Sequence, residues 1–344
     1  FGHCHPEIVA AADRQLHTLT LTSRAFYNDL LGEFCERLCA LTGKSMVLPM
    51  NTGAEAVETA LKTARRWGEF VKGVPAGRQH IVCAENNFHG RTVTVISMST
   101  DPDARRGFSP FTPGFTVVPY GDAAALEAAI TEDTVAYIVE PIQGEAGIII
   151  PPEGYLAAVR EICTRKGILM IADEVQTGFA RTGDMFACMH ENVVPDIYVL
   201  GKALGGGIMP VSAVAADREI LGVYEPGSHG STFGGNPLAC AVALKAMEIV
   251  VRDDYPKMAR EKGARFTEKL REIRNDDIKE VRGRGLLVGV EFFTSAAPYV
   301  KRLIEEGVLA KETHDRTVRF APPVNISDSD LDEAAERIKR ALTK

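Results

Sequence analysis

The chain has 344 residues, of which 45% are hydrophobic and 25% are charged, and its formal net charge is −7. This length and composition predict a soluble globular protein of roughly two domains. The acidic balance argues against nucleic acid as a partner, and no apolar run approaches the ~20 residues that span a bilayer. Seven scattered cysteines favour reduced thiols in the cytoplasm and form no metal-ligand pattern, and any targeting segment would precede Phe1.

The first part of the chain predicts two helices and the start of a sheet. A turn at residues 2–6 leads into a helix over about 7–16, and apolar residues at helical spacing predict a second helix over 30–41. Residues 46–50 are the first expected strand, and a long helix follows it to about Lys72.

Residues 51–56, between this strand and the long helix, are mostly small. The first N–H groups of a helix are free, and the helix dipole favours an anion beside them. The segment is therefore a candidate phosphate site. An ordinary helix cap by Asn51 or Thr52 explains the same residues equally well.

The middle of the chain predicts a doubly wound, mostly parallel sheet, because strands and helices alternate between about 46 and 200. Short apolar runs bounded by turn residues are typical of its buried strands. The expected strands are residues 80–84, 115–120, 135–139, 168–172 and 197–200.

Two of these strands end in residues that suit a lysine-bound cofactor. The expected strand at residues 168–172 is followed by Asp173, and the expected strand at residues 197–200 is followed closely by Lys202. Ligands of open α/β sheets gather at the carboxyl ends of the strands. An acid and a lysine there suit a Schiff base with pyridoxal phosphate, in which the aspartate pairs with the protonated pyridine nitrogen. Such residues are also common at strand ends without any catalytic role.

Other side chains are expected at the same edge. Phe88 could cover a flat ring, and the fork of Arg91 could bind a carboxylate. A lone aromatic residue is more often core, and a lone arginine is more often surface. Glu140 and Glu145, after the strand at 135–139, add two carboxylates.

A glycine-rich loop, residues 230–237, precedes an expected helix over 238–251. Hydroxyls of Ser231 and Thr232 could reach a phosphate, although a flexible surface turn explains the loop as well. From Asp253 the pattern changes to amphipathic helix mixed with short strands, which predicts a smaller α+β domain. We therefore expect a large domain of residues 1–252, with a lead-in over 1–20, and a small domain of residues 253–344.

Together these segments resemble the class III aminotransferases of the fold-type-I pyridoxal-phosphate family. The matching segments occur in the family's order over nearly the whole chain: 51–53 with Glu55, 88–92, 140–145, 173–178, 201–204 and 230–237. Within this class, residues 21–28, 180–183 and 319–323 resemble the ornithine aminotransferases. The resemblance implies a large doubly wound α/β domain that binds pyridoxal 5′-phosphate, with a smaller C-terminal domain.

The resemblance also implies roles around the cofactor. Lys202 would form the Schiff base and shuttle the substrate proton, while Asp173 would keep the pyridine nitrogen protonated. Gln176 would contact the phenolic oxygen of the ring, and Phe88 would stack on the ring. The phosphate would be bound by Thr52, Gly53 and Ala54 and, from the neighbouring subunit of a homodimer, by Ser231 and Thr232.

On the substrate side, the resemblance implies that Arg91 grips the α-carboxylate of L-ornithine. Glu145 and Arg319 would form an ion pair that opens when Arg319 binds the α-carboxylate of 2-oxoglutarate. The implied reaction transfers the δ-amino group to 2-oxoglutarate, giving glutamate and glutamate 5-semialdehyde, which cyclises to pyrroline-5-carboxylate. This reaction belongs to proline biosynthesis and arginine catabolism.

Three alternatives share the same cofactor motifs. They are an acetylornithine aminotransferase, a class III aminomutase or decarboxylase, and a non-catalytic pyridoxal-phosphate-binding protein. Lys202 with Asp173 argues against the last, because binding alone does not need a nucleophilic amine. In the family a further segment, which supplies aromatic residues to the ornithine pocket, precedes the turn at residues 2–6.

Overall fold

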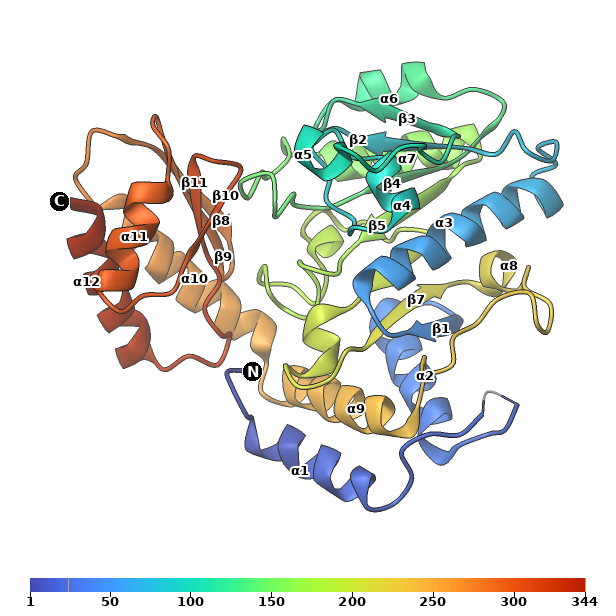
Figure 1. Ribbon diagram of the computed structural model, residues 1–344, viewed down its shortest axis with the longest axis horizontal. Helices are drawn as coiled ribbons and strands as arrows, with labels where there is room; N and C mark the ends of the chain where they lie inside the picture. Colours follow the sequence, from blue (N-terminus) through green and yellow to red (C-terminus); the bar gives the residue numbers. More distant parts are fainter. Residues whose placement is uncertain (24, 344) are drawn as a thin grey trace.

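The computed structural model describes residues 1–23 and 25–343, and this part of the chain forms two β-sheets, each packed against helices (Figure 1). Arg24, within the segment 21–28 that contributes to the narrower resemblance, lies outside the described residues. The large sheet has seven strands in the order β1-β7-β6-β5-β4-β2-β3. These are β1 (Met46–Met50), β2 (His80–Ala84), β3 (Phe115–Val118), β4 (Thr134–Val139), β5 (Leu169–Asp173), β6 (Ile197–Leu200) and β7 (Ser212–Ala216).

The centre of the large sheet is parallel, which confirms the fold expected from the sequence. β2 pairs in parallel with β3 and β4, β4 pairs with β5, and β5 pairs with β6. β3 ends at Val118, two residues earlier than expected, and Pro119 follows it with no N–H to offer the sheet.

β7 is the strand that sequence reasoning missed. It is fully buried and runs antiparallel to both β6 and β1. Its sequence, Ser-Ala-Val-Ala-Ala, contains one β-branched residue and lacks the pattern on which strand prediction depends. The central position of β7 in its part of the sheet, and not its own preference, makes this segment a strand.

The two faces of the large sheet bury different side chains, because successive residues of a strand point to opposite sides. Ile171 of β5 packs toward α3, whereas Met170 and Ala172 pack toward α6 and α7. The helices of this part are α1 (Pro6–Leu16), α2 (Asp29–Thr42), α3 (Gly53–Phe70), α4 (Val93–Ser97), α5 (Pro102–Arg105), α6 (Ala123–Ala129), α7 (Tyr155–Lys166), α8 (Arg218–Leu221) and α9 (Pro237–Arg252).

A second, antiparallel sheet follows in the sequence, with strand order β10-β11-β9-β8. Its core contains Phe266 of α10, Val288 of β9 and Leu331 of α12. In Figure 1 this unit, drawn in orange and red, lies beside the large sheet. Its elements are α10 (Tyr255–Arg271), β8 (Ile278–Arg284), β9 (Leu287–Phe292), α11 (Ala297–Glu305), β10 (Lys311–Thr313), β11 (Thr317–Phe320) and α12 (Asp328–Thr343).

Within residues 1–23 and 25–343, no helix combines the length and the apolar character that a membrane crossing demands.

Candidate active site

Asp173, at the end of β5, is the buried acid of the site. The strand is apolar and fully buried, and it leaves the carboxyl group 5% exposed. Asp173 Oδ1 accepts a hydrogen bond from the backbone N–H of Val175 at 3.1 Å. Asp173 Oδ2 lies 2.7 Å from Nδ1 of His89, whose side chain has no exposed surface. A carboxylate is therefore held in a fixed orientation where cofactors of such sheets bind.

His89 and Glu140 form a buried charged environment around Asp173. Burial alone would lower the pKa of His89, but its hydrogen bond to Asp173 and the charges of Asp173 and Glu140 raise this pKa above its ordinary value. Burial raises the pKa of Glu140 to about 7, against the opposing charge of His89. Glu140 Oε2 also accepts the backbone N–H of Phe88 at 3.0 Å, which fixes the segment that carries Phe88 and His89.

Lys202 begins the 3-10 helix η2 (Lys202–Gly205), two residues after the end of β6. Its backbone has φ of +43°, a left-handed conformation that is uncommon for a residue with a side chain and typical of strained functional positions. Burial lowers the pKa of the Lys202 ammonium below its ordinary value, although Asp173 and Glu145 oppose this effect. A lower pKa increases the fraction of neutral amine, which is the nucleophilic form.

These residues surround one cavity of about 210 Å³. The cavity brings together six of the residues that the sequence placed at the cofactor: Gly53, Ala54, Phe88, Asp173, Gln176 and Lys202. The acid and the amine, which follow neighbouring strands, therefore share one cavity.

The start of α3 closes one end of this cavity. Thr52 caps the helix by accepting the N–H of Glu55, and the Glu55 carboxylate accepts the N–H of Thr52 at 2.8 Å. Gly53 and Ala54 occupy the first helical turn, where N–H groups have no partner within the helix. Gly90 packs against this turn, and a Cβ atom at Gly90 would lie only 2.9 Å from the Cβ of Ala54. The start of α3 therefore offers backbone N–H groups to an anion. Thr52 also caps the helix, which was the other explanation of this segment.

Gln176 provides a test of whether the cavity fits a polar flat ligand. Its Nε2 donates to Glu145 Oε1 at 3.2 Å, while its Oε1 is buried and has no hydrogen-bond partner among the described residues. Gly144 leaves room for this amide, because a Cβ atom there would lie 1.5 Å from Gln176 Oε1. A cavity with an unsatisfied amide, a buried acid, a lysine and a helix start fits the ring, pyridine nitrogen, aldehyde and phosphate of pyridoxal phosphate.

Glu145 and Arg319 form an ion pair beside the cavity. Arg319 lies on β11 of the small sheet, whereas Glu145 follows β4 of the large one. Burial alone would raise the pKa of Glu145, but the hydrogen bond and charge of Arg319 lower it below its ordinary value, with help from Gln176 and Lys202. The two sheets thus meet in a charge pair at the site.

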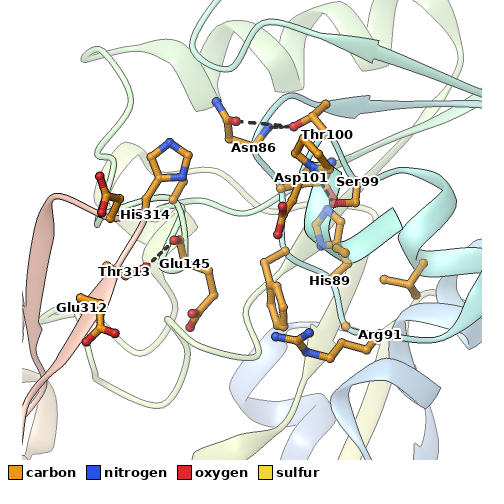
Figure 2. A pocket seen from close by; sticks show the side chains of 18 of the residues that line it. Asn86, His89, Arg91, Ser99, Thr100, Asp101, Glu145, Glu312, Thr313 and His314 are labelled. Atoms are coloured by element: carbon orange, nitrogen blue, oxygen red, sulfur yellow. Dashed lines mark hydrogen bonds between the residues drawn. The ribbon is translucent and has the colours of Figure 1, made fainter. Parts of the chain in front are cut away.

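Arg91 lies in a second, larger cavity of about 450 Å³, shown in Figure 2. Its guanidinium carbon lies 5.6 Å from the centroid of the Phe88 ring. In Figure 2, Arg91 and Glu145 point into this cavity from opposite walls, and residues 312–314 of the small unit line the side beyond Glu145. Arg91 is solvent-exposed, so an incoming carboxylate can reach it.

Three predicted cofactor residues do not line the cavity of their own chain: Thr52, Ser231 and Thr232. Ser231 Oγ accepts hydrogen bonds from Asn51 Nδ2 at 2.9 Å and from the N–H of Gly234 at 3.0 Å. The loop therefore lies beside the residue that precedes the α3 cap, on the outside of the site.

Sequence reasoning overlooked His89 as a site residue and gave Glu140 no specific role. The available signal was position: His89 follows Phe88 just after β2, and Glu140 directly follows β4. Both strands are buried neighbours of one another in the parallel sheet, so residues beyond their carboxyl ends converge near Asp173.

Comparison with known proteins agrees with this geometry. Residues 1–342 match the family model described as aminotransferase class-III. The chain belongs to the class-III aminotransferases. It is 61% identical, over 341 residues, to an ornithine aminotransferase of Brevibacillus brevis, covering 99% of this chain and 86% of the relative.

Solved aminotransferase structures share the fold. An ornithine aminotransferase from Toxoplasma gondii superimposes with a TM-score of 0.97 at 45% identity, covering 99% of this chain and 82% of that one, and pyridoxal phosphate partly occupies its active site. An acetylornithine aminotransferase from Elizabethkingia anophelis gives a TM-score of 0.89 at 43% identity, covering 99% and 85%. The chain is thus a pyridoxal-phosphate-dependent transaminase with the class-III fold.

Proposed function

We propose that this aminotransferase moves the δ-amino group of L-ornithine to 2-oxoglutarate. The products are glutamate and glutamate 5-semialdehyde, which cyclises to pyrroline-5-carboxylate. The observation that carries the proposal is the Glu145–Arg319 ion pair beside Lys202. It gives one site two states, one with Arg319 neutralised for a donor that has a distal amine, and one with Arg319 open for a dicarboxylate acceptor.

Pyridoxal phosphate, when bound, would supply an electron sink for the removal of a proton from the substrate. Asp173 holds the pyridine nitrogen protonated, and His89 orients the Asp173 carboxylate. Lys202 holds the cofactor and moves the substrate proton at its Nζ atom, for which its lowered pKa is suited. When the cofactor is bound, Gln176 would contact its phenolic oxygen and Phe88 would cover one face of its ring, since both residues line the cavity.

The phosphate is bound at the start of α3 by Thr52, Gly53 and Ala54. The helix dipole and the unpaired N–H groups of the first turn support this assignment. Ser231 and Thr232 approach it from the partner subunit of a homodimer.

Exposed apolar side chains in and beside the glycine-rich loop, residues 230–237, support the homodimer. Asn28 Nδ2 donates to the carbonyl of Gly235 at 3.4 Å, which places residues 26–28 next to this loop. Phe26 is 70% exposed, Tyr27 is fully exposed and Phe233 is 54% exposed. Clustered exposed aromatic residues are typical of surfaces that a partner covers.

Arg91 binds the α-carboxylate of ornithine and so presents the distal amine to the reacting centre. Its exposure in the larger cavity, across from Glu145, supports this role. Once the amino group has been received, 2-oxoglutarate displaces Glu145 from Arg319. An arginine fork can exchange one carboxylate for another because both offer it the same bidentate geometry.

We also propose that the domain boundary lies between residues 252 and 253, where α9 ends and before α10 begins. The small domain would then supply Arg319, and the large domain would supply Lys202. The reaction would take place in the cytoplasm, a reducing compartment in which buried thiols such as Cys83 and Cys163 persist. It would link arginine catabolism to proline biosynthesis through the cyclised product.

A steady-state comparison of ornithine with N-acetylornithine as amino donor tests the proposal. The likeness to an acetylornithine aminotransferase makes N-acetylornithine the relevant second candidate. We expect ornithine to give the higher kcat/KM, with pyrroline-5-carboxylate and glutamate formed in equal amounts. A higher kcat/KM for N-acetylornithine would replace this function with the second one.

A further inference from the structure

The segment that carries Glu145 is attached to the small sheet at several points. Arg282 of β8 donates from Nη2 to the carbonyl of Gly147 at 2.6 Å and from Nε to the carbonyl of Ile148 at 2.9 Å. The hydroxyl of Thr313, at the end of β10, donates to the carbonyl of Glu145 (Figure 2). The backbone of this segment is therefore bound to the small sheet, although the segment follows β4 of the large sheet in the sequence.

Thr313 and Arg319 belong to the same hairpin. Thr313 is 5% exposed and pairs with Thr317 across the turn, in which His314 and Asp315 both have positive φ. Arg319 lies two residues after Thr317 on β11. One β-hairpin thus holds Glu145 twice, by its backbone carbonyl through Thr313 and by its carboxylate through Arg319.

We propose that Thr313 is a positioning residue that sets how readily Arg319 exchanges Glu145 for the carboxylate of a substrate. The inference rests on the exchange described under the proposed function. By fixing the Glu145 backbone, the Thr313 hydroxyl keeps the Glu145 carboxylate within reach of Arg319, so that the ion pair forms with little further loss of conformational freedom. A dicarboxylate must displace this pre-organised partner before it can bind.

Loss of the Thr313 hydroxyl is expected to increase the affinity for a dicarboxylate, whereas loss of a hydrogen bond in a binding site usually lowers affinity. Removal of the hydroxyl frees Glu145, weakens its pair with Arg319 and makes Arg319 easier to capture, so a dicarboxylate should bind more tightly. A net hydrogen-bond contribution of the usual size corresponds to roughly 3- to 10-fold in affinity. A substitution that only disordered the site would instead lower the affinity for a dicarboxylate, because a disordered site binds ligands less tightly.

The test is calorimetric titration of the holoenzyme with glutarate, an unreactive dicarboxylate. We expect Thr313→Val to bind glutarate roughly 3- to 10-fold more tightly than the wild type, and Thr313→Ser, which keeps the hydroxyl, to match the wild type. The matched control is Thr317→Val, the same change at the buried cross-strand partner, whose hydroxyl lies near Gly147 and not at the Glu145 carbonyl. Thr313→Ala is a second hydroxyl-free variant in case Thr313→Val does not fold.

Three results would overturn the inference. They are unchanged or weaker glutarate binding in the hydroxyl-free variants, an equal gain in Thr317→Val, or a gain in Thr313→Ser. Arg319→Gln separates this failure from failure of the proposed function. If glutarate binding persists in Arg319→Gln, the exchange itself is wrong and the inference falls with it; if binding requires Arg319 but ignores Thr313, only the inference falls.

Discussion

His89 Nδ1 lies 2.7 Å from Asp173 Oδ2, and both buried residues line the cavity that fits the cofactor. The contact links the end of β2 to the end of β5, two strands separated in the sheet by β4. Asp173 has one further hydrogen-bond donor among the described residues, the N–H of Val175. The orientation of the carboxylate therefore depends strongly on His89.

We expect His89→Leu to weaken binding of pyridoxal phosphate on the order of 10- to 100-fold, because a buried carboxylate loses a charge-assisted hydrogen bond. His89→Asn is the matched variant, since its amide can donate from nearly the same position as Nδ1. It should retain most of the affinity. Titration of the apoenzyme with the cofactor, followed by absorbance, measures both. Equal affinities for wild type and His89→Leu would show that Asp173 does not need this partner.

Lys202→Ala should lose the visible absorption band that pyridoxal phosphate acquires on binding a lysine amine. The rate should fall by at least 10²- to 10⁴-fold, the usual contribution of a positioned acid–base group. Lys72→Ala is the control, because burial also lowers the pKa of Lys72, but its amine donates to the carbonyl of Thr134 at the opposite end of β4. A normal band in Lys202→Ala would contradict the assignment.

Arg91→Gln should reduce kcat/KM for ornithine by roughly 10- to 100-fold, since a charge-assisted contact to the α-carboxylate is lost. The second half of the reaction, with 2-oxoglutarate, should change much less. Arg106→Gln, at an exposed arginine paired with Asp103 outside the site, controls for the loss of charge. Single-turnover rates with each substrate measure the two halves separately, and equal losses would contradict the assignment.

Glu140 makes stability depend on pH. Its pKa is raised by burial from 4.5 to about 7 in the folded protein, so between these values the folded state holds a proton that the unfolded chain has released. The free energy of unfolding therefore falls as the pH rises through this window. In Glu140→Gln the group no longer titrates, and the stability of this variant relative to wild type should rise by about 3 kcal/mol from pH 4.5 to pH 7.

Urea unfolding of the two apoproteins at a series of pH values checks this expectation. Parallel stability curves for wild type and Glu140→Gln would mean that folding does not raise the pKa of Glu140. His89→Asn should be measured beside them, because the charge of His89 opposes the shift of Glu140.

The buried parallel strands could be predicted because each is a short apolar run between turn residues, and β5 and β6 are clear examples. β7 could not, since its small residues become a strand only when β1 and β6 flank them. Periodicity and turn residues can be recognised in a short stretch of sequence, so they predict local structure. Pairing between distant segments depends on the whole sheet and cannot be predicted in this way.

The residues of the site also differ in whether the sequence could predict them. Asp173 and Lys202 were found from their positions at strand ends, but nothing in the sequence near His89 indicates that its ring meets Asp173, 84 residues further on. Glu145 and Arg319 are 174 residues apart, and only the family resemblance joined them before the structure did. Ser231 and Thr232 remain a prediction for the dimer, since the cavity of a single chain does not include them.

Lys202 follows a strand of the large sheet, whereas Arg319 lies within a strand of the small one. A keto acid held between them must therefore match in length the distance that separates two independently packed cores. Selectivity for acceptor chain length is then a property of how those cores are seated against one another. Substitutions along their common boundary, far from any bound molecule, could alter which dicarboxylates the enzyme accepts.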